Sequence, residues 1–305
     1  MPGGVQDSGS RVQASAFRRP THSFKGWGLN RAFIASARGL FGSLSDALLP
    51  QTCVACDRWI TTDESPICPR CRAALEPARA LPYCPRCART MLALSIHEKS
   101  CARCRTEGFW NVASVARVGE YRRVGEYREE TLRRLLVGLK FVGSDRQAVC
   151  LGKLLADALR KKPWLNEIQA LVPVPMHRLR RWQRPADHAR VLAEAVSREL
   201  GIPVRNAAVR RVKYSISQTR TLSRAARFRN VKGCFGPARR PKIAGQTVCI
   251  IDNLLVTGAT IHEVSKVLRK AGAKRIYAAV VARARLPGDP EPPAEALMPP
   301  PDQAD

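Results

Sequence analysis

Four Cys-x-x-Cys pairs stand close together in the first third of the chain. The pairs are Cys53/Cys56, Cys68/Cys71, Cys84/Cys87 and Cys101/Cys104. Each such turn can present two thiolates to one tetrahedral zinc ion, and two turns complete a four-thiolate site. Because we expect no export signal at the N-terminus, the pairs indicate metal binding rather than disulfides. The spacing therefore predicts zinc-ribbon sites that hold structural Zn²⁺ and leave no position open for a substrate.

The way in which the four pairs join is not fixed by the sequence. Eleven residues separate Cys56 from Cys68, and thirteen separate Cys87 from Cys101. Sequential joining would build one site from the first two pairs and a second site from the last two. Interleaved joining would build a cross-brace instead. We favour the sequential arrangement.

A second kind of chemistry is indicated by the stretch "TVCIIDNLLVTGAT" (Thr247–Thr260). Four apolar residues lead into Asp252 and Asn253, and Thr-Gly-Ala-Thr then opens a helical pattern. Backbone N–H groups at a helix N-terminus bind phosphate, and glycine lets the backbone approach closely. A carboxylate at the carboxyl end of a parallel strand lies where α/β sheets bind ligands. An ordinary strand-to-helix turn capped by threonines is the alternative interpretation.

On the functional interpretation, the segment Asp252–Thr260 is a ribose 5-phosphate site, and we call it the phosphate loop. Asp252 would contact the ribose hydroxyl groups or the hydration shell of Mg²⁺. Asn253 can accept and donate hydrogen bonds but supplies no charge. The phosphate itself would be held by four residues: Thr257, Gly258, Ala259 and Thr260.

The elements that must position this loop alternate from residue 168 onward. We expect strands at 168–175, 247–252 and 275–284, helices at 186–200 and 258–273, and two earlier helices at 129–141 and 148–162. Strand–helix–strand order implies right-handed parallel crossovers. The predicted fold is therefore α/β, with a parallel sheet and flanking helices, preceded by a small cysteine-rich zinc-ribbon module.

Composition divides the 305 residues into five segments. We expect a disordered leader (1–28), an amphipathic helix (29–50), a double zinc-ribbon module (51–108), an α/β domain (109–285) and a disordered acidic, proline-rich tail (286–305). The cysteine-rich segment has few large aliphatic residues, so it needs metal to be stable. We expect no membrane span and a cytoplasmic location.

The chain is strongly basic, with 52 Lys and Arg against 25 Asp and Glu and a net charge of +27. Such a charge attracts polyanions, although a solvated basic surface would have the same composition. Many of the basic residues fall in two loop-like regions: Arg178, Arg180, Arg181, Arg184, Arg210, Arg211, Lys213, Arg220, Arg224, Arg227 and Arg229. Arginine matches phosphate bidentately, so pyrophosphate or nucleic acid is the expected partner.

Several motifs together resemble one protein family. "VCIIDNLLVTGAT" resembles the phosphoribosyl diphosphate loop of type I phosphoribosyltransferases. The order of an amphipathic leader, a cysteine module and this domain resembles the ComF family over residues 40–285. Three further stretches agree with that family: "YREETLRRLLVGLKF" (127–141), "LVPVPMH" (171–177) and "SQTRTLSRAARFRNVKGCF" (217–235).

The resemblance implies a type I phosphoribosyltransferase-like fold that binds phosphoribosyl diphosphate with Mg²⁺ at the phosphate loop. It adds Lys140 and Arg184 to the ligand-binding residues. It also implies a link to DNA uptake and natural transformation, with single-stranded DNA and competence-machinery proteins as partners. The sequence departs from the family at three places: Asn253 replaces its second acid, Val256 its first loop threonine, and Pro185 a glycine.

Two functions therefore remain open. One is a phosphoribosyltransferase, a pentosyl-transferring enzyme, in which Asp252 is the catalytic candidate. The other is a non-catalytic zinc-dependent module that binds single-stranded DNA or senses phosphoribosyl diphosphate. The phosphate half of the loop is intact, whereas Asn253 and Val256 alter the ribose half.

Overall fold

The computed structural model describes residues 51–60, 65–91, 100–107, 112–121, 130–141, 145–177, 186–214, 224–239, 241–286 and Asp289. The predicted leader, the predicted helix at 29–50 and Arg184 lie outside the described residues. The described residues all belong to one compact unit, Pro50–Asp305, which contains both the cysteine pairs and the phosphate loop.

The centre of this unit is a four-stranded parallel sheet with the order β1-β6-β5-β2. The strands are β1 (Val115–Tyr121), β2 (Ala170–Pro173), β5 (Thr247–Leu255) and β6 (Arg275–Ala284). β5 and β6 are almost continuously apolar and buried, as expected for parallel strands that are covered on both faces. The predicted parallel α/β fold is confirmed.

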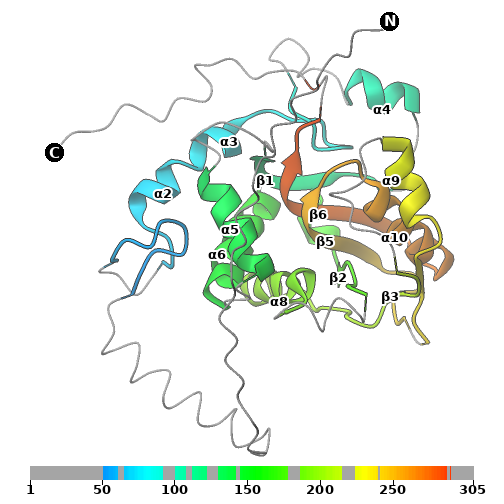
Figure 1. Ribbon diagram of the computed structural model, residues 1–305. Helices are drawn as coiled ribbons and strands as arrows, with labels where there is room; N and C mark the ends of the chain where they lie inside the picture. The colour runs from blue at the N-terminus through cyan, green and yellow to red at the C-terminus, as the bar shows by residue number, and fades with distance from the viewer. Residues whose placement is uncertain are drawn as a thin grey trace, which may run out of the picture. The chain divides into compact units, whose positions relative to one another are not determined.

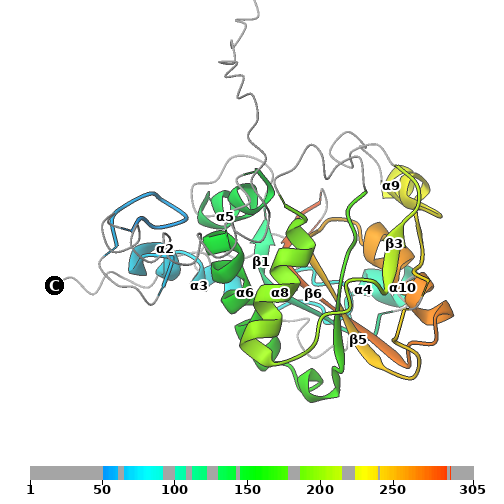
Figure 2. The same ribbon diagram turned by 90° about the horizontal axis from the view of Figure 1, so that it is seen from below.

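Helices cover the two faces of the sheet. α5, α6 and α8 lie on one side, and α9 and α10 lie on the other (Figure 1; Figure 2). Their bounds are α5 (Glu130–Phe141), α6 (Asp145–Arg160), α8 (His188–Leu200), α9 (Arg224–Val231) and α10 (Ala259–Lys270). α8 ends at Gly201, whose φ of 71° is a left-handed conformation that glycine adopts without strain.

The sheet separates two hydrophobic cores. Alternate residues of a strand point to opposite faces, and in β6 Tyr277 and Ala279 belong to one core while Ala278 and Val280 belong to the other. The first core also contains the buried cysteines of the first two pairs and the buried faces of α5, α6 and α8. The second contains the cysteines of the last two pairs together with residues of α10. The two halves of the cysteine module therefore pack against opposite faces of one sheet.

Short elements complete the described fold. They are α2 (Pro69–Ala73), α3 (Glu76–Ala80), α4 (Ala102–Glu107), the 3₁₀ turn η3 (Leu165–Glu167), β3 (Val209–Arg211) and β4 (Phe235–Pro237). β3 and β4 form a separate antiparallel pair. Among the residues described, no helix combines the length and apolar character needed to cross a membrane.

One predicted boundary is wrong. We expected the strand to end at Asp252, but β5 continues to Leu255 because Leu254 and Leu255 pair with Ala282 and Arg283 of β6. The turn before α10 therefore has only three residues, 256–258. On its other side, β5 loses its neighbour earlier, since its pairing with β2 ends at Ile251 opposite Pro173. Asp252 is thus the first residue of β5 that β2 does not pair with.

Candidate metal centres and phosphate site

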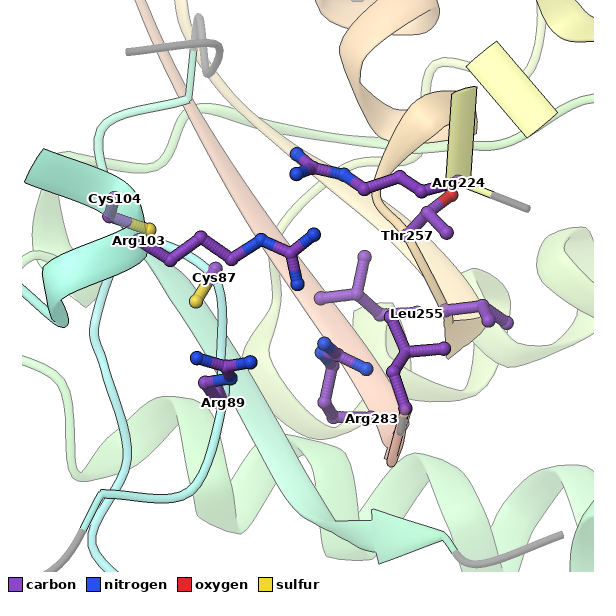
Figure 3. A pocket seen from close by; sticks show the side chains of 10 residues that line it. Cys87, Arg89, Arg103, Cys104, Arg224, Leu255, Thr257 and Arg283 are labelled. Atoms are coloured by element: carbon purple, nitrogen blue, oxygen red, sulfur yellow. The ribbon is translucent and has the colours of Figure 1, made fainter. Parts of the chain in front are cut away.

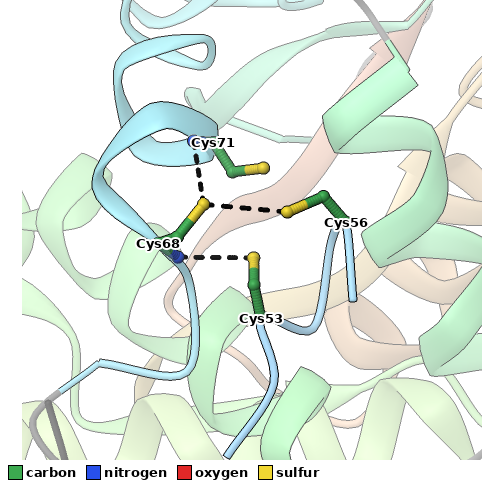
Figure 4. Close-up of side chains that lie close together, drawn as sticks. All are labelled: Cys53, Cys56, Cys68 and Cys71. Carbon is green, nitrogen blue, oxygen red and sulfur yellow. Dashed lines mark hydrogen bonds between the residues drawn. The ribbon is translucent and has the colours of Figure 1, made fainter. Parts of the chain in front are cut away.

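The first cysteine cluster consists of Cys53, Cys56, Cys68 and Cys71, whose sulfur atoms all lie within 4.8 Å of one another (Figure 4). The Sγ atoms of Cys56 and Cys68 are 3.8 Å apart. Backbone N–H groups donate to two of the sulfurs, from Cys68 to Cys53 at 3.3 Å and from Cys71 to Cys68 at 3.4 Å. Such donors stabilise thiolates, which are the form that binds metal.

The second cysteine cluster consists of Cys84, Cys87, Cys101 and Cys104, with the same spread of sulfur positions. The Cys84 and Cys104 sulfurs are 3.9 Å apart, and those of Cys87 and Cys101 are 3.7 Å apart. The Cys101 N–H donates to the Cys84 sulfur at 3.3 Å. The first two pairs thus form one group and the last two form another, so the sequential arrangement is confirmed.

Both clusters fit zinc. Four thiolates that converge within this range form the donor set of a closed tetrahedral zinc site. Burial raises the pKa of Cys53, but N–H donors from Cys68 and Ala55 outweigh burial and bring that pKa to about 7. A hydrogen bond from Cys104 is the largest of the effects that bring the pKa of Cys101 to about 6. In each cluster, hydrogen bonds thus favour the thiolate form of one cysteine, which is the form that binds metal.

The second cluster is fastened to the sheet by a buried polar network. Arg117 of β1 donates to the Ala88 carbonyl at 2.7 Å and to the Thr90 hydroxyl at 3.0 Å. Thr90 donates to Glu120 at 2.8 Å, and Glu120 lies 3.6 Å from Arg117. The side chains of Arg117 and Glu120 are 1% and 3% exposed, so this ion pair is fully desolvated. The knuckle formed by residues 84–91 cannot shift without breaking these bonds.

The phosphate loop enters α10 in an open conformation. Gly258 is the N-cap residue, with φ of 84°, and no side chain makes a capping hydrogen bond there. The Thr257 hydroxyl accepts from the Ala259 N–H only at 3.5 Å. The alternative interpretation, an ordinary turn capped by threonines, has only this long contact in its support, because the left-handed Gly258 occupies the N-cap position. N–H groups left without such a cap suit an anion.

Asp252 lies in a charged environment at the end of the sheet. Burial raises its pKa to about 6, against the opposing effects of the Asn253 N–H and of the positive charges of Lys140 and Arg211. The Asn253 N–H donates to Asp252 at 2.8 Å. Lys140 was singled out by sequence, and the structure places it where its charge acts on Asp252. A carboxyl with this pKa changes charge near neutral pH.

Asn253 has a different environment from its neighbour. It is 4% exposed, and its Nδ2 atom has no hydrogen-bond partner among the described residues. A buried amide donor without a partner is costly, and it is a frequent mark of a ligand or water site.

Sequence reasoning missed Asp187, whose charge acts on Asp252. Asp187 precedes α8 and accepts from the Met176 N–H at 3.4 Å, so it joins the end of β2 to the start of α8. The sequence did offer one signal for this residue, because Asp187 stands just before a predicted helix that follows a predicted buried strand. The sequence contains one carboxylate in the loop, but the fold brings a second one near it.

A pocket lies where the ends of β5 and β6 approach the second cysteine cluster (Figure 3). We call it the arginine pocket, because Arg89, Arg103, Arg224 and Arg283 line it together with Cys87, Cys104, Leu255, Val256, Thr257 and Leu286. Of these four arginines, only Arg224 was singled out by sequence. The other three arginines are spread over 195 positions, and no local pattern connects them.

Two domain families match the chain. The double zinc ribbon domain matches residues 44–105, and the phosphoribosyl transferase domain matches residues 185–294. The first match contains both cysteine clusters, and the second contains Asp252 and the whole phosphate loop. The fold and the site thus define a phosphoribosyltransferase-like α/β protein that carries a double zinc ribbon.

Full-length relatives agree with this class. Competence protein F of Haemophilus influenzae is 29% identical over 237 residues, which cover 76% of this chain and 96% of the relative. DNA utilization protein YhgH of Escherichia coli K12 is 26% identical over 232 residues, which cover 75% and 95%. The resemblance to the ComF family is therefore confirmed, for the chain combines a double zinc ribbon with a phosphoribosyltransferase domain.

Solved structures of phosphoribosyltransferases are also similar at a lower level. UMP synthase from Leishmania donovani has a TM-score of 0.30 and 21% identity, over 50% of this chain and 24% of that one. Purine phosphoribosyltransferase from Pyrococcus horikoshii has a TM-score of 0.28 and 17% identity, over 47% and 88%. The fold assignment rests on the parallel sheet and the domain match rather than on these scores.

Proposed function

We propose that the chain binds phosphoribosyl diphosphate, or a ligand of the same chemistry, at Asp252–Thr260. The observation that carries the proposal is the conjunction of Asp252 with a helix N-terminus. Asp252 follows the last residue that β2 pairs, and beyond the end of β5 at Leu255 a three-residue turn leads into α10, whose N-cap is the left-handed Gly258 without a side-chain cap. The helix end suits the 5-phosphate, and the carboxylate suits the ribose hydroxyls.

The charges around Asp252 favour a ligand with a second anionic group. Lys140 and Arg211 both act on Asp252, and either can neutralise a diphosphate. Mg²⁺ would be held between that diphosphate and a carboxylate, since magnesium binds through one or two carboxylates and substrate phosphates. Asp252 and Asp187, whose charge acts on Asp252, are two carboxylates that could take this role. Arg184, which lies outside the described residues, is the remaining proposed ligand.

Whether the bound ligand also reacts depends on the ribose end. A transition state with positive charge at the ribose is stabilised by nearby carboxylates, and removing one such group costs several kcal/mol. Here Asn253 is neutral and buried. We therefore propose binding with weak pentosyl transfer at most, in which Asp252 is the catalytic candidate.

Calorimetric titration of the zinc-loaded full chain with phosphoribosyl diphosphate and Mg²⁺ tests binding. Lys140→Gln should weaken binding about tenfold, because a charge-assisted hydrogen bond contributes roughly 1.5–3 kcal/mol. Arg133→Gln removes a positive charge from an exposed position of the same helix and should change affinity less than about twofold. Equal effects of the two variants, or no heat at millimolar ligand, would refute the proposal.

We further propose that the protein acts in DNA uptake, in the cytoplasm, with competence-machinery proteins. The names of the relatives, Competence protein F and DNA utilization protein, support this role. None of the eleven cysteines, all of which the structure describes, forms a disulfide, and this suits a reducing compartment. The net charge of +27 suits direct contact with single-stranded DNA. DNA affinity that does not change between 50 and about 200 mM salt would contradict direct contact.

A further inference from the structure

We propose that the arginine pocket is a second anion site, which takes a phosphate group carrying two negative charges. It is separate from the proposed phosphoribosyl diphosphate site, since none of the residues whose charges act on Asp252 lines it. The two sites share a wall, because Thr257 lies in the phosphate loop and also lines the pocket.

The first argument is convergence. Arg89 follows the Cys84/Cys87 knuckle, Arg103 lies on α4, Arg224 begins α9, and Arg283 lies near the end of β6. Four guanidinium groups from four separate segments turn toward one space (Figure 3). Like charges repel when they are brought together, and an anion between them turns that repulsion into attraction. Guanidinium groups also match phosphate oxygens bidentately.

The second argument is an unsatisfied donor. The Arg283 side chain is 6% exposed, and its Nη1 atom has no hydrogen-bond partner among the described residues. Its Nη2 atom lies 3.5 Å from Asp289. A buried guanidinium with one satisfied and one unsatisfied arm is costly, and an acceptor in the pocket would satisfy it.

The third argument is that the chain already places a carboxylate here. Asp289 has a side chain that is 1% exposed and lies 2.5 Å from Arg89, and its other oxygen accepts from the Leu286 N–H at 2.9 Å. Asp289 thus holds Arg89 and Arg283 in position. It supplies one negative charge against four positive ones, so it organises the pocket without neutralising it.

The alternative is that the arginines only offset the second cysteine cluster. Four thiolates with one Zn²⁺ carry a net charge of −2, and Cys87 and Cys104 line the pocket. Together with Asp289 this leaves one of the four positive charges in excess. Arg224 comes from α9 rather than from the cysteine module, and it lines the pocket together with Thr257 (Figure 3). Offsetting the cluster does not require an arginine at that place.

Inorganic pyrophosphate is the probe for the zinc-loaded full chain. Arg103→Gln with Arg224→Gln should weaken pyrophosphate binding about tenfold or more, since two charge-assisted contacts are lost. Arg105→Gln with Arg229→Gln is the matched control, because it removes the same charge from α4 and α9 at exposed positions that do not line the pocket. The control should change affinity less than about twofold.

Equal pyrophosphate affinity in the pocket variant and the wild type would overturn the proposal, and so would equal losses in both double variants. If the pocket variant does not fold, chemical modification of the wild type by phenylglyoxal gives an independent readout. Pyrophosphate should protect Arg103 and Arg224 but not Arg105. Protection of all three alike, or of none, would again overturn it.

Two further arms identify the source of the phosphate and separate this site from the proposed function. Two short DNA strands, one with a 5′-phosphate and one with a 5′-hydroxyl, are compared as competitors of pyrophosphate. Stronger competition by the 5′-phosphate strand identifies the end of a DNA strand as the ligand. Equal competition by the two strands identifies a free phosphate compound. In a Lys140→Gln background, the Arg103→Gln and Arg224→Gln pair should still weaken pyrophosphate binding by the same factor as in the wild type. The two proposals can also fail separately. If the pocket variant binds pyrophosphate as tightly as the wild type and still binds phosphoribosyl diphosphate, the pocket proposal is refuted and the proposed function is not.

Discussion

The two cysteine clusters have the same chemistry but different surroundings. The first packs into the core formed with α5, α6 and α8, and the second packs into the core that contains α10. Two cysteines of the second cluster line the pocket that reaches Thr257, whereas no residue of the first cluster does. Identical metal sites can thus serve different purposes, because the first only completes a core while the second also forms a wall of a candidate ligand site.

The attachments of the two clusters differ in the same way. Arg146 donates to the Thr52 carbonyl at 3.0 Å, and Arg134 reaches the Ala55 carbonyl at 3.4 Å from an exposed position. The second cluster depends instead on the fully buried Arg117 network. A fully buried network fixes a position more strictly than partly buried contacts do, because each broken bond leaves an unpaired group without water. A cluster that forms the wall of a ligand site must keep a fixed position, and the buried network provides it.

The largest effect should follow loss of a metal ligand. Cys53→Ser and Cys84→Ser should each lower the unfolding free energy by more than about 4 kcal/mol, because zinc binding contributes directly to folding. Pyrophosphate affinity of the folded fraction should fall only for Cys84→Ser. Chemical unfolding and calorimetry measure the two quantities, and equal affinity losses would erase the distinction between the clusters.

The next effect concerns the attachments. Arg117→Met should destabilise the fold by roughly 3–5 kcal/mol, since it leaves Glu120 buried without its closest cation. Arg134→Met removes a long, partly buried hydrogen bond that an exposed residue makes to the first cluster, and it should cost less than about 1 kcal/mol. Urea unfolding of the two variants compares them directly. A larger loss for Arg134→Met would reverse the order that the burial of the two side chains implies.

A smaller effect should appear with pH on the ligand side of the sheet. The pKa of Asp252 is raised to about 6, so its carboxylate is present above that pH and is lost as the pH falls. Affinity for phosphoribosyl diphosphate with Mg²⁺ should therefore drop about tenfold between pH 7.5 and pH 5, since one pH unit below the pKa leaves about a tenth of the group ionised. The ligand also gains protons in this range, so Asp252→Asn serves as the reference and should show a flatter profile. Parallel profiles would exclude Asp252 as the titrating group.

The smallest effect should come from glycine at the turn. Gly258→Ala should cost about 1 kcal/mol of stability, because alanine is strained at φ of 84°. Gly233→Ala is the control, with φ of 67° and nothing within 4 Å of an added Cβ atom. Thermal unfolding should show similar losses, but only Gly258→Ala should weaken ligand binding. Weaker binding in both variants would indicate a general loss of structure rather than a local role.

Much of this fold could be predicted because its signals are local. The cysteine spacings indicated two four-thiolate clusters, and the apolar run before Asp252 indicated a buried parallel strand. The extension of β5 to Leu255 escaped prediction, because it depends on pairing with β6 rather than on Leu254 or Leu255 themselves. Lys140 was found only through family resemblance, since a lysine near the end of a helix has no distinctive spacing.

The arginine pocket could not be predicted for a related reason. Arg89, Arg103 and Arg283 are ordinary surface residues by sequence, in a chain that contains 52 Lys and Arg. They meet because the second cluster folds against the end of β6, a contact between segments that are far apart along the chain. Asp289 falls in the segment predicted as a disordered tail, yet its side chain is buried between two of these arginines. Long-range charge pairing of this kind leaves no periodic trace.

A crystal structure of the zinc-loaded chain grown with phosphoribosyl diphosphate and Mg²⁺ tests the central claim most directly. We predict that the 5-phosphate lies within hydrogen-bond distance of backbone N–H groups between Thr257 and Thr260, and that Asp252 contacts the ribose hydroxyls. A ligand bound elsewhere, or an empty phosphate loop at millimolar ligand, would contradict the account.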